Sequence, residues 1–218
     1  MNLGEIIAAY RVEAFDNEVP PFCSDELLAL YATEAQTEAC RRGVILRDSV
    51  SPMCSLAFAA DATHVVIAPQ IVRILRARTG GHDVTTIDVE DMDASFPNWQ
   101  DDASRGRPTH LVAGMTTGAL HLWPRPADAG TLSLTVQRMP IKALVNDTDK
   151  PEIRQEAHQA LVDWLIHKAC SRQDGELFNA QKASAALDRF EKEFGRKSSL
   201  RNEEWVRSGV NTGPAPIA

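Results

Sequence analysis

The clearest pattern of hydrophobic and polar positions lies near the end of the chain, in residues 151–195. In residues 151–170, apolar side chains recur every three or four positions, the spacing that places them on one face of a helix. Asn179 suits the N-cap of a second helix, and Gly195 suits the position just after its end. We therefore predict two helices joined by a polar turn. The predicted core of this helical hairpin consists of Leu161, Trp164, Leu187, Phe190 and Phe194.

The first part of the chain has the same helical periodicity. Apolar positions in residues 3–15 predict a short amphipathic helix, which the prolines Pro20 and Pro21 separate from the next. Ser24 suits the N-cap of a second helix, and two arginines and a glycine at residues 41–43 suit its C-terminal end. We therefore predict helices at both ends of the chain.

Between residues 49 and 150 the pattern becomes typical of β-strands. Short runs rich in β-branched residues are separated by proline, glycine and aspartate. Gly80-Gly81 and residues 127–130 have the composition of hairpin turns. Several strands at this spacing favour a small antiparallel sandwich or barrel.

These patterns together predict an α+β fold in three parts. Residues 1–48 and 151–195 are expected to form a helical-bundle body, with residues 49–150 inserted as a small antiparallel β-sandwich or barrel module. Residues 196–218 lack a periodic apolar face and predict an extended C-terminal arm, because such a segment buries too little surface to fold alone. The arm's candidate contacts with a partner are Arg196, Lys197, Arg201, Trp205 and Arg207.

Composition and charge narrow the class of protein. The chain has 218 residues, 44% of them hydrophobic, which suffices for a core. A net charge of −7 argues against a general nucleic-acid coat. No apolar run has the length of a membrane span, and no signal-peptide pattern is present, so we expect no membrane contact. Four widely spaced cysteines favour a reducing, cytoplasmic environment during folding.

Beyond these patterns, the sequence resembles a known family. Residues 160–174, followed by residues 179–195, resemble the C-terminal helices of head-to-tail adaptor proteins of tailed bacteriophages. The upstream segments agree in their order, and the resemblance covers about residues 1–195. The other matching segments, a helix start and several strand ends and turns, are residues 24–28, 107–110, 120–126 and 138–140.

The resemblance implies a structural virion protein rather than an enzyme. Such adaptors form a ring, commonly of twelve subunits, beneath the portal protein, where they join the capsid vertex to the tail and extend the DNA channel. The implied partners are the portal protein, other copies of the chain and the next neck or tail component. Genomic DNA would pass through without sequence-specific binding. The implied location is the neck of the virion, after assembly in the host cytoplasm, with the C-terminal arm docked on the portal.

A closed ring needs two different, complementary surfaces on each subunit, and charged residues are candidates for them. Residues 82–104 are rich in acids and contain no lysine or arginine, whereas arginines flank them on both sides. Contacts between subunits are one interpretation, and a solvated loop with local ion pairs is the other. The residues expected in contacts between subunits are Arg76, Arg78, Asp88, Glu90, Asp91, Asp93, Arg105 and Arg107.

Candidate chemistry is weak in this sequence. A calcium loop counted from Asp88 lacks the glycine and glutamate of an EF-hand, since Asp93 and Trp99 occupy those positions. His158 and His167 fall on opposite faces of one predicted helix, and the spacing of a zinc site is absent. No phosphate-binding or nucleophile motif occurs. We therefore expect no catalytic, cofactor-binding or metal-binding residues and no cofactor.

Two other functions remain open. One is another neck or tail-completion protein, such as a stopper or tail terminator, for which a shorter chain dominated by β-strands would be more typical. The other is a virion-associated glycan hydrolase, which requires a pair of carboxylates. Acids are abundant here, but none lies in an apolar stretch of sequence that would raise its pKa.

Overall fold

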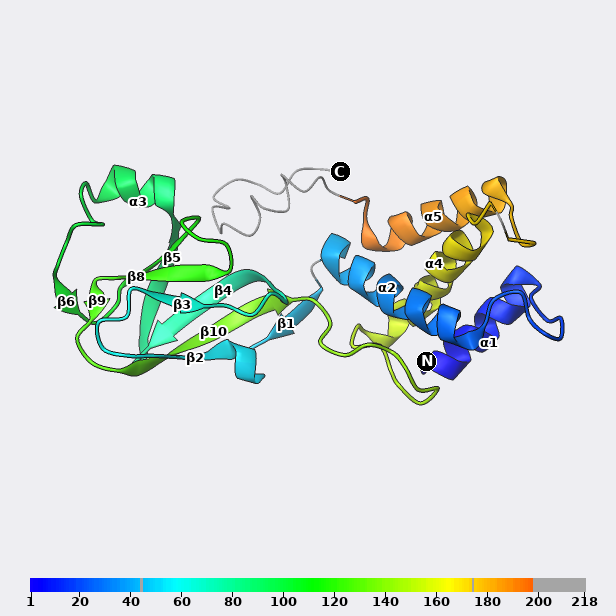
Figure 1. Ribbon diagram of the computed structural model, residues 1–218, viewed down its shortest axis with the longest axis horizontal. Coiled ribbons are helices and arrows are strands. Elements are labelled where there is room, and N and C mark those ends of the chain that lie inside the picture. Colours follow the sequence, from blue (N-terminus) through cyan, green and yellow to red (C-terminus); the bar gives the residue numbers. More distant parts are fainter. Residues whose placement is uncertain (44, 174, 198–218) are drawn as a thin grey trace. The chain divides into compact units, whose positions relative to one another are not determined.

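The computed structural model describes residues 1–43, 45–173 and 175–197. These residues form two compact units (Figure 1). The helical unit comprises Met1–Leu46 and Met139–Lys197, and the sheet unit comprises Arg47–Arg138. The sheet unit is therefore inserted between two segments that fold together, and each unit has its own hydrophobic core.

Four α-helices and one short 3₁₀-helix make up the described part of the helical unit. Ser24 and Asn179 accept hydrogen bonds from the first turns that follow them, at Leu27 and Lys182, as their sequence positions predicted. Gly195 ends the last helix with φ +88°, a backbone conformation that favours glycine. The elements are α1 (Leu3–Ala14), α2 (Asp25–Gly43), η2 (Gln155–Ala157), α4 (His158–Cys170) and α5 (Ala180–Phe194).

The four α-helices pack around one core. Phe190 of α5 is fully buried and contacts the ring of Trp164 on α4, with 4.9 Å between the ring centroids. The guanidinium of Arg42 on α2 lies 5.4 Å from the Trp164 centroid and 5.3 Å from that of Phe190, at distances typical of cation–π contacts. Arg42 also forms an ion pair with Glu191, so it links α2 to α5. Leu161 and Phe194 are buried, and Leu187 is half-buried.

The segment that follows the sheet unit packs on these helices through buried polar contacts. Gln36 of α2 is fully buried, donates to the carbonyl of Lys142 at 2.8 Å, and accepts from the amide of Glu152 at 3.3 Å. Thr33 exchanges hydrogen bonds with the backbone of Leu144. Because buried polar groups are costly without partners, these bonds fix the path of residues 139–157.

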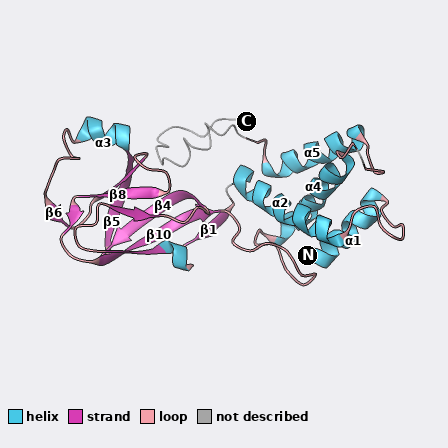
Figure 2. Ribbon diagram, viewed as in Figure 1, coloured by secondary structure: helices cyan, strands magenta, loops and turns pink. Residues whose placement is uncertain are grey.

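The sheet unit contains ten strands and two short helices. Eight strands form one sheet in the order β1-β10-β4-β5-β7-β8-β3, with β2 also paired to β10, and β6 pairs with β9. Figure 2 shows the strands in magenta and the helices in cyan. The pair β5–β7 is parallel, and α3 connects the two strands. The elements are β1 (Leu46–Asp48), η1 (Pro52–Cys54), β2 (Ser55–Phe58), β3 (His64–Val66), β4 (Ile71–Thr79), β5 (His82–Asp88), α3 (Val89–Ser95), β6 (Arg105–Gly106), β7 (His110–Ala113), β8 (Ala119–Trp123), β9 (Arg125–Pro126) and β10 (Gly130–Arg138).

The predicted fold class is wrong. The chain is not a helical-bundle body with a small antiparallel β-sandwich or barrel inserted, but a mixed structure of helices and one large curled sheet. The prediction failed because short β-rich runs show neither which strands pair nor that β4 and β10, of nine residues each, form the long central pair. The prediction also missed α3 and the parallel crossover. A helix of seven residues has only about two turns, which is too short for a clear hydrophobic periodicity in the sequence.

One ion pair joins the two ends of the sheet unit. The Nε of Arg138, at the end of β10, donates to Oδ2 of Asp48, at the end of β1, at 2.6 Å. The side chains are 13% and 10% exposed, respectively. Burial disfavours the charge of Asp48, but hydrogen bonds from the backbone of Val50 and Ser51, from the Ser51 side chain and from Arg138 outweigh it and hold its pKa well below the usual range.

We expect Phe190→Ala to lower the free energy of unfolding of the helical unit by about 3–5 kcal/mol, because it leaves a cavity in the core. Urea denaturation followed by circular dichroism measures this change. The matched control is Phe178→Ala, since Phe178 is 48% exposed and its loss should cost less than about 1 kcal/mol. Equal effects of the two substitutions would contradict the core position of Phe190.

We expect Asp48→Asn to lower the free energy of unfolding at pH 7 by about 1.5–3 kcal/mol, because a charged hydrogen-bond acceptor is lost. The lowered pKa of Asp48 means that its contribution is present above the unfolded-state pKa of about 3.9 and is lost as pH falls through the folded-state value. The difference between the variant and the original chain should therefore narrow below about pH 4.

Urea denaturation of both proteins at pH 7 and at pH 3 tests this expectation. Asp83→Asn is the control, since Asp83 is exposed and its ion pairs are accessible to solvent. A difference for Asp48→Asn that stays constant with pH would show that its charge does not stabilise the fold.

Candidate functional site

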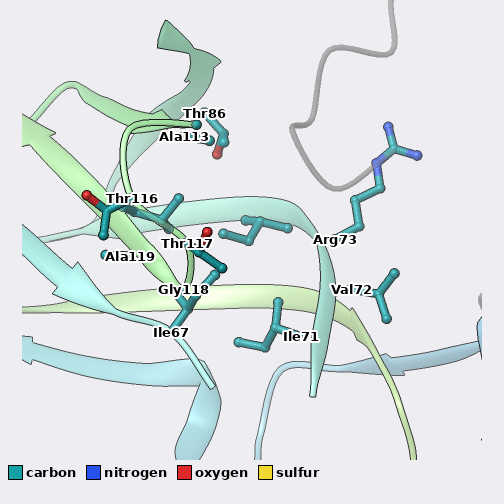
Figure 3. A pocket seen from close by; sticks show the side chains of 13 residues that line it. Ile67, Ile71, Val72, Arg73, Thr86, Ala113, Thr116, Thr117, Gly118 and Ala119 are labelled. Carbon is teal, nitrogen blue, oxygen red and sulfur yellow. The ribbon is translucent and has the colours of Figure 1, made fainter. Parts of the chain in front are cut away.

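A cavity of about 180 Å³ opens between the start of β4 and the turn that connects β7 to β8. Its lining is apolar at Ile67, Ile71 and Leu120, and hydroxyl groups of three threonines add polarity. Arg73 lines its edge, with the guanidinium directed away from the labelled threonines (Figure 3). Among the described residues that line this cavity there is no acid, histidine, cysteine or lysine, so these side chains provide no general acid or base.

Two glycines shape the turn beside this cavity. Gly114 has φ +91° and Gly118 has φ +76°, conformations that other residues rarely adopt. A side chain at position 114 would also approach Val89 and Asp88, at the start of α3, at 3.3–3.4 Å. The two glycines therefore allow the chain to reverse direction in the turn that lines the cavity.

The acidic stretch of residues 82–104 begins with strand β5 and helix α3, and residues 96–104 form turns and loop. Asp88 is the N-cap of α3 and accepts a hydrogen bond from the amide of Glu90 at 3.2 Å. Glu90 and Asp91 lie in the first turn of α3, where negative charges interact favourably with the helix dipole. Asp93 accepts a hydrogen bond from the indole of Trp99 at 2.6 Å. Several of the acidic side chains in this stretch therefore stabilise the local structure of α3 and the turn that follows it.

Most of the arginines around this stretch have ion-pair partners within the same chain. Arg76 and Arg78 of β4 both pair with Asp83 of the adjacent β5, at 3.0 Å. Arg105 pairs with Asp61 at 2.7 Å. All of these side chains are exposed, so the pairs contribute little to stability. The structure therefore does not join these arginines to the acids of α3.

Three of the predicted charged residues form neither an ion pair nor a side-chain hydrogen bond in the part of the chain that the structure describes, whereas Asp88 and Asp93 accept hydrogen bonds. The side chains of Glu90, Asp91 and Arg107 are exposed and form no ion pair there. Arg107 lines a second cavity, of about 560 Å³, beside Gly130 and the loop that precedes β7. These three residues are the ones whose charges remain available to another molecule.

The predicted C-terminal arm lies mostly outside the described residues. Arg196 is 92% exposed, with its Nε 3.9 Å from the Glu191 carboxylate, and Lys197 is also exposed. Arg201, Trp205 and Arg207 lie outside the described residues.

Histidines and aromatic rings gather on β7 and β8, an arrangement that sequence spacing did not reveal. The rings of His110, Trp123 and Phe96 lie against one another, with centroids 4.7–5.4 Å apart. His64 on β3 faces His121 on β8, with 5.7 Å between centroids. Burial lowers the pKa of His110, and burial together with the charge of His64 lowers the pKa of His121. The only feature of the sequence that relates to these histidines and aromatic rings is the alternation of side chains along neighbouring strands.

The described residues contain no group of three or more His, Cys, Asp or Glu residues that could hold a metal ion. The four cysteines are buried thiols, and burial raises the pKa of Cys54 and of Cys170, which disfavours the nucleophilic thiolate. None of the helices that the structure describes has the length and apolar character to cross a membrane.

Comparison with known proteins gives a match that covers both units. A family model described as SU10 adaptor protein matches residues 1–213. A search of curated proteins finds no match to the chain.

Proposed function

Because the chain belongs to the SU10 adaptor protein family, a family of phage structural proteins, we propose that it joins the capsid vertex to the tail as a head-to-tail adaptor. In this proposal, copies of the chain form a ring of twelve subunits beneath the portal and extend the channel for DNA. The family match over nearly the whole chain is the observation that carries this proposal. Each subunit is assembled in the host cytoplasm and then remains in the virion neck.

The available charges support contacts between neighbouring subunits. A ring with cyclic symmetry joins two different patches of adjacent copies. Glu90 and Asp91 on α3 are negative, whereas Arg107, before β7, is positive, and none of them has an ion-pair partner in the described chain. We therefore assign these three to the subunit interface, with Arg76, Arg78, Asp88, Asp93 and Arg105 holding its local structure.

The arm is the proposed contact with the portal. Residues 196–218 contain four basic side chains and one tryptophan, and the first two of these bases are exposed where α5 has ended. Basic side chains combined with an indole suit a partner surface that has both acidic and apolar groups. The same proposal leaves the channel DNA without specific contacts, because a net charge of −7 repels phosphates.

Two alternatives explain less of the chain. A stopper or tail-terminator protein would share the location in the neck, but the family match is to an adaptor. A glycan hydrolase needs two carboxylates facing one cavity, and none of the described residues that line the sheet cavity beside β4 carries one.

Native mass spectrometry of the full chain, alone and mixed with its portal protein, tests the proposed function. We expect a monomer alone and a ring-sized complex with the portal, because a portal ring brings the subunit interfaces together. If the chain never associates with the portal, the adaptor proposal is wrong, and glycan hydrolysis becomes the next assay.

We expect the arm to provide most of the affinity for the portal. Replacing the four arm bases (Arg196, Lys197, Arg201 and Arg207) by glutamine and Trp205 by alanine should lower the amount of complex at least tenfold, since charged and aromatic contacts dominate such interfaces. The control is Lys150→Gln/Arg154→Gln, which removes two exposed bases that the proposal assigns to no interface and should leave portal binding unchanged. Unchanged binding of the arm variant would remove the arm from the interface.

A further inference from the structure

Two histidines far apart in the sequence meet on adjacent strands of the sheet unit. His64 lies on β3 and His121 on β8, and the antiparallel register pairs them directly. β3 is the last strand in the order of the sheet, so this pair lies at a sheet edge. His64 is exposed and His121 is half-buried, which leaves the pair open to solutes.

The hydrogen-bond pattern brings these two side chains close together. The amide of Leu122 donates to the carbonyl of Thr63 at 2.9 Å, and the amide of Ile67 donates to the carbonyl of Gly118 at 2.9 Å. Hydrogen-bonded pairs alternate along an antiparallel ladder, so the intervening histidine pair is a non-hydrogen-bonded one. At such positions the Cα atoms are only about 4.5 Å apart and the side chains are closest.

The ring geometry suits a shared ligand. The two imidazole centroids lie 5.7 Å apart, with 37° between the ring planes. A metal ion bound to two imidazole nitrogens at about 2.0–2.1 Å places the ring centroids roughly 4.5 Å apart for adjacent square-planar ligands and roughly 5 Å apart for tetrahedral ones. Small rotations of the rings, one of them on an exposed side chain, therefore bring both nitrogens within reach of one ion.

Neighbouring groups support this arrangement. Thr63 Oγ1 lies 3.1 Å from Nδ1 of His64. In the tautomer that carries its proton on Nδ1, the hydroxyl oxygen accepts this proton and the Nε2 lone pair is free to bind an ion. Metal-binding histidines in proteins commonly donate their second N–H in this way. His121 also lines a cavity of about 310 Å³, which has room for water beside the ring.

We propose that His64 and His121 form a two-nitrogen binding site for a transition-metal ion such as Cu²⁺, Ni²⁺ or Zn²⁺. Imidazole suits these ions, whereas Mg²⁺ and Ca²⁺ prefer oxygen ligands. Water completes the coordination, because the described residues offer no third histidine, cysteine or carboxylate at this place. The site binds its ion reversibly and is distinct from the charged residues assigned to the subunit interface.

Isothermal titration of the full chain, prepared without a histidine tag, with NiCl₂ and with CuCl₂ tests the site. We expect one ion per chain and tighter binding of Cu²⁺ than of Ni²⁺, in the order that nitrogen ligands impose. His64→Ala and His121→Ala should each lower the affinity at least tenfold. The electron paramagnetic resonance spectrum of the Cu²⁺ complex should show two coordinated imidazole nitrogens in the original chain.

His82→Ala is the matched control, because His82 is an exposed histidine of the same unit, on β5, and the chain has six histidines in all. It should bind both ions like the original chain. Because His64 is exposed, circular dichroism should show that His64→Ala keeps its fold. The proposal is overturned if neither ion binds, or if His64→Ala and His82→Ala bind equally well.

Discussion

The sheet unit is one long segment of the chain whose two ends must lie close together. The ion pair between Asp48 and Arg138 joins these two ends. The chain enters this unit at β1 and leaves it at the end of β10, and the 2.6 Å contact lies where the two strands meet. Closing so long a loop is entropically unfavourable until non-local contacts compensate for it. A mostly buried carboxylate that accepts bonds from an arginine and two backbone amides supplies such a contact, since leaving either charge alone would be costly.

The other strands of the sheet pair outward from β10, whose end this ion pair holds. With its end fixed, β10 pairs along its length with β4, and also with β1 and β2. From β4 the sheet extends through β5 to the parallel strand β7, and α3 packs Met92 against Trp99 and Val112 beside that crossover. Charged residues near the crossover are consequently used to cap the helix and to pair neighbouring strands. The charges that remain free for partners are those that this local structure does not need.

Local patterns in the sequence predicted local structure, whereas non-local pairing escaped them. Ser24, Asn179 and Gly195 determine helix ends through bonds to residues a few positions away, so their roles were visible in the sequence. Arg76 and Arg78 stand two positions apart on β4, so alternation along a strand puts both on one face, and both reach Asp83. Which strands meet depends on the whole fold, so the sequence predicted neither the large sheet nor the approach of His64 to His121.

Because non-local contacts are not visible in short sequence patterns, an adaptor is hard to identify from the chemistry of a few side chains. An enzyme concentrates its function in a few side chains with perturbed pKa values in one cavity. Here the cavity beside β4 is lined by aliphatic and threonine side chains, and the strongly shifted carboxylate, Asp48, holds the ends of the sheet unit together. A protein that assembles with others spreads its function over exposed surfaces, where single residues contribute little and no short motif is required. The match over nearly the whole chain therefore says more about this protein than any one cluster of residues.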